Sequence, residues 1–204
     1  GINYEKLQIE KEPHDGINIG SILRIVPIKD VMTMIRAFRI VKDKVDNVTF
    51  YLIGPTEEDP VYAQQCFDLV TLLNLQDSII FTGRVNVREY LGKLDILVLT
   101  SISEGQPLVI LEGWAAKIPS VSTDVGSCKE LLNPDQFEGP CGLVTKMASP
   151  SDTARAILEM IANPELRKKM GENGYERGKR YYNEQVLVSR YQQIFDFISR
   201  KYNI

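Results

Sequence analysis

The feature of this 204-residue chain that most limits its fold is an alternation of short apolar runs with segments of helical periodicity. The runs are rich in Ile, Val and Leu and lack the inside/outside alternation of a strand with one solvated face. The predicted strands are Ile17–Ile25, Thr49–Ile53, Ser78–Thr82, Asp95–Thr100, Ser120–Ser122 and Gly142–Lys146. Strands buried on both faces, each followed by a helix, predict an α/β fold with a doubly wound, parallel, Rossmann-like sheet.

Helical segments separate or follow these strands, and additional helices end the chain. The predicted helices are Lys29–Lys42, Pro60–Leu73, Val87–Gly92, Pro107–Ala116, Ser127–Leu132, Ser151–Ala162, Pro164–Arg180 and Glu184–Tyr202. Asp59 is expected to be the N-cap of the second helix, with Pro60 at its first position. The last helix carries one apolar stripe, which we expect to pack against another surface. Its members are Leu187, Tyr191, Ile194, Phe195 and Ile198.

Composition bounds the functional class. Lys and Arg total 24 against 27 for Asp and Glu, a net charge of −3 that argues against a nucleic-acid-binding domain. The three cysteines are odd in number and widely spaced, as expected in a reducing compartment. No run of 18 apolar residues and no signal-peptide pattern occurs. We therefore expect a cytoplasmic chain, with peripheral membrane association open only through parts of the protein outside it.

Several kinds of ligand site are disfavoured by missing motifs. No Gly-x-Gly-x-x-Gly follows the first strand, which argues against a dinucleotide-dependent dehydrogenase, and no Gly-Lys-Ser/Thr indicates a P-loop. The acidic run Glu57–Asp59 is a candidate metal site, but Asp59 is expected to be a helix cap and no Asp-x-Asp occurs. His14, the only histidine, lies in an aperiodic segment. We expect neither a metal nor another cofactor.

The segment Thr100–Trp114 carries the strongest chemical signal. An apolar strand ends, a loop carries Glu104, and a helix that contains Glu112 then opens at Pro107. Ligands of doubly wound sheets bind at the loops beyond the carboxyl ends of the strands, so both carboxylates can face one cleft. Carboxylate oxygens accept hydrogen bonds from adjacent sugar hydroxyls. The spacing by itself is equally compatible with a turn residue and an exposed helix residue.

Taken in order, the motifs resemble those of the family 4 glycosyltransferases. The matching segments are Arg24-Ile-Val-Pro-Ile-Lys29-Asp30, Leu52-Ile-Gly54-Pro55, Phe81-Thr-Gly83, Glu104 with Glu112, and Thr123-Asp-Val-Gly126. The resemblance covers nearly all of residues 16–204 and implies one half of the GT-B fold of a retaining enzyme. It divides the chain into a hinge arm (1–16), a nucleotide-sugar-binding domain (17–183) and a C-terminal crossover helix (184–204).

The resemblance also implies a role for each matched position. Arg24 and Lys29 would bind the donor diphosphate, Glu104 the transferred sugar and Glu112 the ribose hydroxyls, while Gly54, Gly83, Arg84 and Val85 would border the base. Fixed cations after the first strand suit this role, because a leaving diphosphate gains negative charge in a water-poor site. Gln106-Pro107 replaces the more usual Phe-Gly, and Pro107 has no N–H. We therefore expect Leu108 and Val109 to supply the backbone donors.

Narrower features point to a donor and an acceptor. The segments GPTEEDPVYAQQC, SISEGQPLVILEG and TDVGSCKELL are similar to those of the cytoplasmic glycosyltransferases of the Pel exopolysaccharide pathway. This implies hexosyl transfer from a UDP-sugar to a glycan or exopolysaccharide acceptor. GT-B enzymes place the acceptor on an N-terminal domain that has no counterpart here, so the chain is expected to bind donor and to be inactive or poorly active alone. Two alternatives stay open: a GT-B sugar-nucleotide epimerase, which needs no acceptor, and a non-catalytic nucleotide-sugar-binding module.

Overall fold

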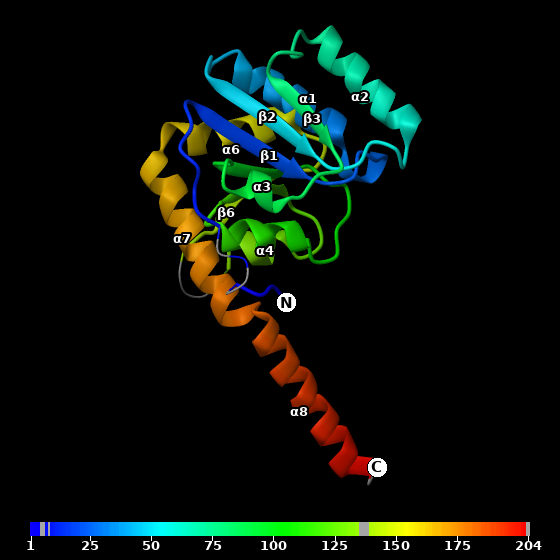
Figure 1. Ribbon diagram of the computed structural model, residues 1–204, viewed down its shortest axis with the longest axis vertical. Helices are drawn as coiled ribbons and strands as arrows, with labels where there is room; N and C mark the ends of the chain where they lie inside the picture. The colour runs from blue at the N-terminus through cyan, green and yellow to red at the C-terminus, as the bar shows by residue number, and fades with distance from the viewer. Residues whose placement is uncertain (5–6, 8, 135–138, 203–204) are drawn as a thin grey trace.

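The computed structural model describes residues 1–4, 7, 9–134 and 139–202. Its centre is a six-stranded parallel sheet in the order β3-β2-β1-β4-β5-β6 (Figure 1). The strands are β1 Ile17–Ile22, β2 Val48–Ile53, β3 Ile79–Gly83, β4 Ile96–Leu99, β5 Ser120–Thr123 and β6 Gly142–Thr145. The predicted α/β, doubly wound, Rossmann-like sheet is confirmed.

The helices follow the predicted pattern closely. They are the 3-10 helix η1 Pro27–Lys29 and the α-helices α1 Val31–Lys42, α2 Pro60–Leu72, α3 Arg88–Leu91, α4 Leu108–Ala115, α5 Cys128–Leu132, α6 Pro150–Ala162, α7 Pro164–Tyr181 and α8 Glu184–Tyr202. The Asp59 side chain caps α2 by accepting from the N–H of Tyr62 at 3.0 Å, as the sequence predicts. No helix in the described ranges is long and apolar enough to cross a bilayer.

Strand β4 shows why the central strands carry no polar alternation. Its residues Ile96 and Val98 pack into a core with α1, α2 and α6, whereas Leu97 and Leu99 pack into cores on the opposite face. All four side chains are buried. On that opposite face, Leu99 packs against residues of α4, and α7 packs against α4 in turn. Helices therefore cover both faces of the sheet. An apolar residue is therefore favoured at every position of the strand.

The first strand is shorter than its apolar run suggests. β1 ends at Ile22, and the chain then turns through η1 before α1 begins at Val31 rather than at Lys29. Asp30 is the reason for the late start, because it adopts a left-handed conformation with φ 45° and accepts from the N–H of Thr33. An N-cap of this kind satisfies one of the free N–H groups at a helix start. Arg24 and Lys29, the last residue of η1, therefore both lie in the connection between β1 and α1.

The first residues of the chain are attached to the domain at two places. Tyr4 is buried, and its hydroxyl donates to the carbonyl of Leu111 in α4 at 3.1 Å. Further along, Asp95 accepts from Lys11 Nζ at 2.6 Å and from His14 Nε2 at 2.8 Å. Burial acts to raise the pKa of the Asp95 carboxyl, but these hydrogen bonds and one from the N–H of Asn18 outweigh it and hold the pKa below its usual value. Asp95 therefore stays charged and anchors the arm.

Helix α7 lies against α4 through a row of glycines. An added Cβ at Gly174 would lie 2.4 Å from a ring atom of Trp114, and one at Gly178 would lie 1.9 Å from the hydroxyl of Tyr4. Only a residue without a side chain lets these aromatic groups approach so closely. The segment Pro164–Arg180 is strongly charged, and the sequence pattern gave no prediction of this packing face.

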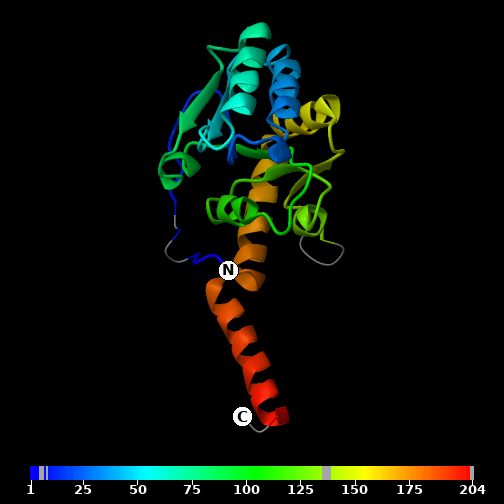
Figure 2. The same cartoon turned by 90° about the vertical axis from the view of Figure 1, so that its right-hand side faces the viewer.

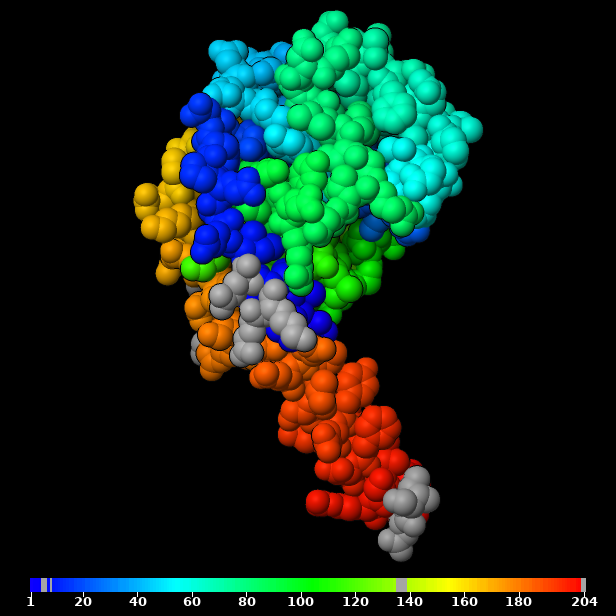
Figure 3. All heavy atoms as spheres, viewed as in Figure 1, coloured from blue at the N-terminus to red at the C-terminus, as the bar shows by residue number. Residues whose placement is uncertain are grey.

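Helix α8 extends away from the sheet domain in both views (Figures 1 and 2) and forms the protrusion in Figure 3. None of its described residues is buried. The apolar stripe that we expected to pack is exposed, with Phe195 at 64% and Tyr191 at 55% of their full accessibility. The division of the chain into arm, domain and crossover helix stays a prediction.

Candidate functional site

A cavity of about 360 Å³ opens at the carboxyl ends of β1, β2 and β4. Its wall includes Ile22, Ile53 and Leu99, the last residues of these strands. Because β2 and β4 lie on opposite sides of β1, this is the point where the strand order reverses, and doubly wound sheets bind ligands there. The volume is in the range of small-molecule sites, about 300–1,000 Å³.

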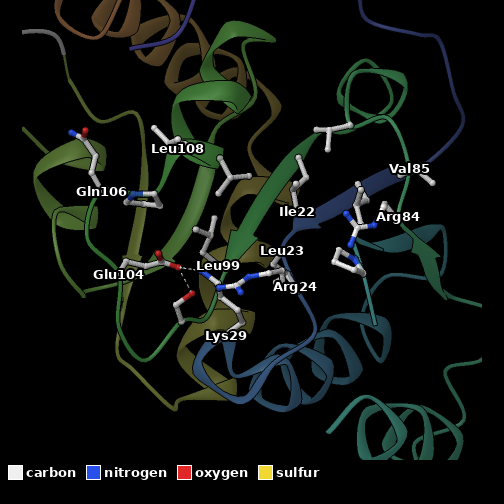
Figure 4. Close-up of a pocket in the computed structure, with 17 residues that line it drawn as sticks. Ile22, Leu23, Arg24, Lys29, Arg84, Val85, Leu99, Glu104, Gln106 and Leu108 are labelled. Atoms are coloured by element: carbon white, nitrogen blue, oxygen red, sulfur yellow. Dashed lines mark hydrogen bonds and ion pairs between the residues drawn. The ribbon is translucent and has the colours of Figure 1, made fainter. Parts of the chain in front are cut away.

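Most residues that the sequence predicts for the site line this cavity (Figure 4). They are Arg24, Lys29, Gly54, Arg84, Val85, Glu104, Leu108 and Val109. The other two predicted site residues, Gly83 and Glu112, lie outside the lining. Gly83 forms an isolated bridge with Gly54, and Glu112 is half-buried one turn further along α4. The roles assigned to all ten residues stay predictions.

An ion pair between Lys29 and Glu104 forms part of the cavity wall. Lys29 Nζ lies 2.5 Å from Glu104 Oε1, and the two side chains are 20% and 12% exposed. Figure 4 shows them pointing toward each other from the loops after β1 and β4. The hydroxyl of Ser101, a residue that the sequence analysis did not single out, also donates to Glu104 Oε1, at 2.6 Å. Both described bonds fall on Oε1, so Oε2 is the oxygen that can accept from a ligand.

The loop that carries Glu104 is held in place by contacts with β5 and with the turn that follows β5. The hydroxyl of Thr123 donates to the carbonyl of Ser101 at 2.7 Å, and the N–H of Ser127 donates to the carbonyl of Gly105 at 3.0 Å. Gly126 has φ 53°, and an added Cβ there would lie 2.1 Å from the carbonyl oxygen of Glu104. The motif Thr123-Asp-Val-Gly126 therefore acts as a support for the carboxylate.

Two further cations border the cavity, and each is paired with an acidic residue of the loop after β2. Arg24 Nη1 lies 2.8 Å from Glu58 Oε2, and Arg84 Nη2 lies 3.2 Å from Glu57 Oε1. The sequence analysis considered these two glutamates only as part of an acidic run and did not predict the pairing. The pairing depends on the strand order, which places β2 between the strands that precede the two arginines, and no local sequence pattern signals it.

Helix α4 directs its first turn at the cavity. The first N–H groups of a helix have no intrahelical partner and carry the positive end of its dipole. Leu108 and Val109 provide these groups and line the cavity, while Pro107 lies just before the helix in an extended conformation. No hydrogen bond or ion pair to Glu112 is described, and burial raises the pKa of its carboxyl above the ordinary value.

Among the described residues no cluster of His, Cys, Asp and Glu side chains could hold a metal ion. Glu104, which lines the cavity, pairs with Lys29, and Glu58 and Glu57 pair with the lining residues Arg24 and Arg84. The independence from metals and other cofactors that the sequence suggests stays a prediction.

Comparison with known proteins identifies the family. Residues 4–177 match the model of the family described as glycosyl transferases group 1, and the chain belongs to this family. It is 32% identical over 191 residues to an uncharacterized glycosyltransferase of Methanocaldococcus jannaschii, which covers 92% of this chain and 50% of that protein. The chain spans about half the length of such relatives.

Solved structures show the same fold. The C-terminal domain of a glycosyl transferase group 1 family protein of Francisella tularensis has a TM-score of 0.79 at 25% identity, covering 90% of this chain and all of that domain. Anabaena HepE, in a complex with UDP-glucose, has a TM-score of 0.83 at 20% identity, covering 98% of this chain and 56% of that protein. The chain thus has the fold of one part of longer glycosyltransferases.

The close approach at Gly54 gives a test of this geometry. Gly54 has φ 142°, and an added Cβ would lie 1.9 Å from the carbonyl oxygen of Leu23. We expect Gly54→Ala to lower the free energy of unfolding by more than about 2 kcal/mol, since backbone strain and a steric clash add. Gly83→Ala is the matched control, because that site also has a positive φ but no atom within 4 Å, and it should cost about 1 kcal/mol. Equal losses in urea denaturation would contradict this account.

Proposed function

We propose that this chain is the nucleotide-sugar-binding domain of a retaining glycosyltransferase that uses a UDP-linked sugar. The observation that carries the proposal is the convergence of Arg24, Lys29, Glu104 and the first turn of α4 on one cavity at the switch point of the sheet. The complexes of HepE with UDP and with UDP-glucose support the choice of ligand class. The motif order Arg24, Lys29, Glu104, Glu112 supports the retaining class through the resemblance stated above.

The donor diphosphate would bind between the cations and the helix. Arg24 offers a fork of N–H donors that matches phosphate oxygens, and Lys29 offers a compact charge. The N–H groups of Leu108 and Val109 add hydrogen bonds at the positive end of the helix dipole. In the proposed reaction these groups take the place of a metal ion as counter-charges, because they stabilise the negative charge that develops on the leaving UDP.

Glu104 would orient the sugar that is transferred. Its Oε1 is already held by Lys29 and Ser101, which fixes the direction of the carboxylate. The second oxygen can then accept a hydrogen bond from a sugar hydroxyl. A carboxylate held in this way loses little side-chain freedom when the donor binds, so the sugar is positioned at low entropic cost.

The proposed chemistry is a front-face transfer. The acceptor hydroxyl attacks the anomeric carbon on the face from which UDP leaves, so the configuration is retained. The bond between the anomeric carbon and the diphosphate oxygen breaks, a bond to the acceptor oxygen forms, and the acceptor proton passes to the departing diphosphate. Arg24 and Lys29 stabilise that diphosphate, and the retained pair of Lys29 with Glu104 keeps the sugar beside it.

The acceptor and the location of the enzyme are further parts of the proposal. We infer a cytoplasmic hexosyltransferase that extends a glycan or exopolysaccharide, following the resemblance to the Pel pathway enzymes. Since the chain spans about half the length of its relatives, acceptor binding is assigned to residues outside it. The chain by itself should bind donor with little or no transfer.

Removal of the Arg24 charge tests the assignment of the diphosphate site. Arg24→Ala should weaken UDP binding by about tenfold to a hundredfold, the value of one or two hydrogen bonds between charged groups, and should leave uridine binding unchanged. Calorimetry with and without EDTA measures both the loss and the independence from metals. Arg88→Ala, which removes an exposed cation outside the cavity, is the control and should have no effect. Equal UDP affinity in wild type and Arg24→Ala would contradict the assignment.

The pH dependence of binding tests Glu112. Burial raises the pKa of its carboxyl above the ordinary value of 4.5, and ribose hydroxyls would donate more strongly to its charged form than to its neutral form. Binding then favours the carboxylate, so UDP affinity should fall as the pH is lowered from neutral through the raised pKa. Glu112→Gln should bind UDP more weakly at neutral pH and lose this part of the pH dependence. Because UDP itself takes up a proton, the difference between the two proteins is the measured quantity, and parallel profiles would exclude the ribose role.

A further inference from the structure

Every cation that lines the donor cavity among the described residues is already paired with a carboxylate. Lys29 pairs with Glu104, Arg24 with Glu58, and Arg84 with Glu57. The cavity is therefore balanced in charge before any ligand enters. A diphosphate that binds to Arg24 has to share this guanidinium with Glu58 or replace it.

The carboxylates of the Arg24–Glu58 and Arg84–Glu57 pairs both belong to the loop after β2. In the sheet β2 lies between β1 and β3. Arg24 lies in the connection after β1, and Arg84 lies in the connection after β3. The loop after β2 carries Glu57 and Glu58, one for each arginine. Its ends are fixed, since the N–H of Ile25 donates to the carbonyl of Pro55 at 3.0 Å and Asp59 caps α2. Thr56, Glu57 and Glu58 are the residues between these two anchors, and both glutamates are exposed.

The Arg24–Glu58 pair is more exposed to solvent than the Lys29–Glu104 pair. The side chains of Arg24 and Glu58 are 56% and 38% exposed, whereas those of Lys29 and Glu104 are 20% and 12% exposed. An exposed ion pair contributes little net stability because water solvates both partners when it opens. A buried pair is strongly destabilised when one partner is lost. An anion that competes for one of these cations therefore replaces Glu58 at a lower cost than Glu104.

We propose that Glu58 holds Arg24 in the ligand-free protein as an internal competitor and is exchanged for the diphosphate of the donor. This inference rests on the proposed function. It makes Glu58 a residue that sets donor affinity: it keeps the guanidinium at the mouth of the cavity and lowers the affinity for every ligand that must take Arg24 from it. Ligands that do not reach Arg24, such as uridine, are unaffected.

The test is calorimetry of UDP and uridine binding at one ionic strength. Glu58→Gln keeps the size of the side chain and removes its charge, and it should tighten UDP binding about two- to fivefold, the value of an exposed ion pair, without changing uridine binding. Glu57→Gln is the matched control. It removes the same charge from the adjacent position, but Glu57 pairs with Arg84 and not with Arg24. Unchanged or weaker UDP binding by Glu58→Gln overturns the inference, as does an equal gain in Glu57→Gln.

A double-variant cycle distinguishes competition for Arg24 from general repulsion of the diphosphate. In the Arg24→Ala background the Glu58→Gln change should bring no gain, because no guanidinium is left to release. A gain that persists without Arg24 overturns the inference. If UDP binds to none of the proteins, the proposed function itself fails; if UDP binds and Arg24→Ala weakens it while Glu58→Gln has no effect, only this inference fails.

Discussion

The ion pair between Lys29 and Glu104 is the interaction on which the site depends, because it joins the two halves of the sheet. Lys29 follows β1 and Glu104 follows β4, and the 2.5 Å contact closes the switch point between them. The hydroxyl of Thr100 strengthens this junction by donating to the backbone carbonyls of Lys29 and Asp30. Both charges are largely removed from water, so each needs the other. In the proposed reaction this pair sets the spacing between the diphosphate and the sugar.

The remaining charges differ from this pair in how firmly they are held. The loop of Glu104 is supported from β5 by Thr123 and Gly126, whereas Glu57 and Glu58 project from an exposed loop. A rigid carboxylate suits the orientation of a sugar, and an exposed one suits an exchange of partners. The cavity can therefore be balanced in charge when empty and still accept an anion. Its two kinds of ion pair follow from burial rather than from residue type.

Local patterns were sufficient to predict the strands and most helix boundaries. The grouping of Arg24, Lys29 and Glu104 was predicted from the family resemblance, and it agrees with a parallel sheet, whose strands bring their carboxyl ends to one edge. What escaped prediction depends on contacts between distant segments. The pairing of Glu58 with Arg24 requires the strand order, and the packing of Gly174 against Trp114 requires the position of α7 on α4. The apolar stripe of α8 was visible in the sequence, yet nothing in the described chain covers it.

The central claim is that this cavity binds a nucleoside diphosphate, with uracil as the preferred base. Calorimetry of the chain with UDP, GDP, ADP and uridine at one ionic strength tests this most directly. We expect UDP to bind, GDP and ADP to bind more weakly, and uridine to lose most of the affinity because it lacks the negative charges that would pair with Arg24 and Lys29. Uridine binding as tight as UDP, or no binding of any diphosphate, would contradict it.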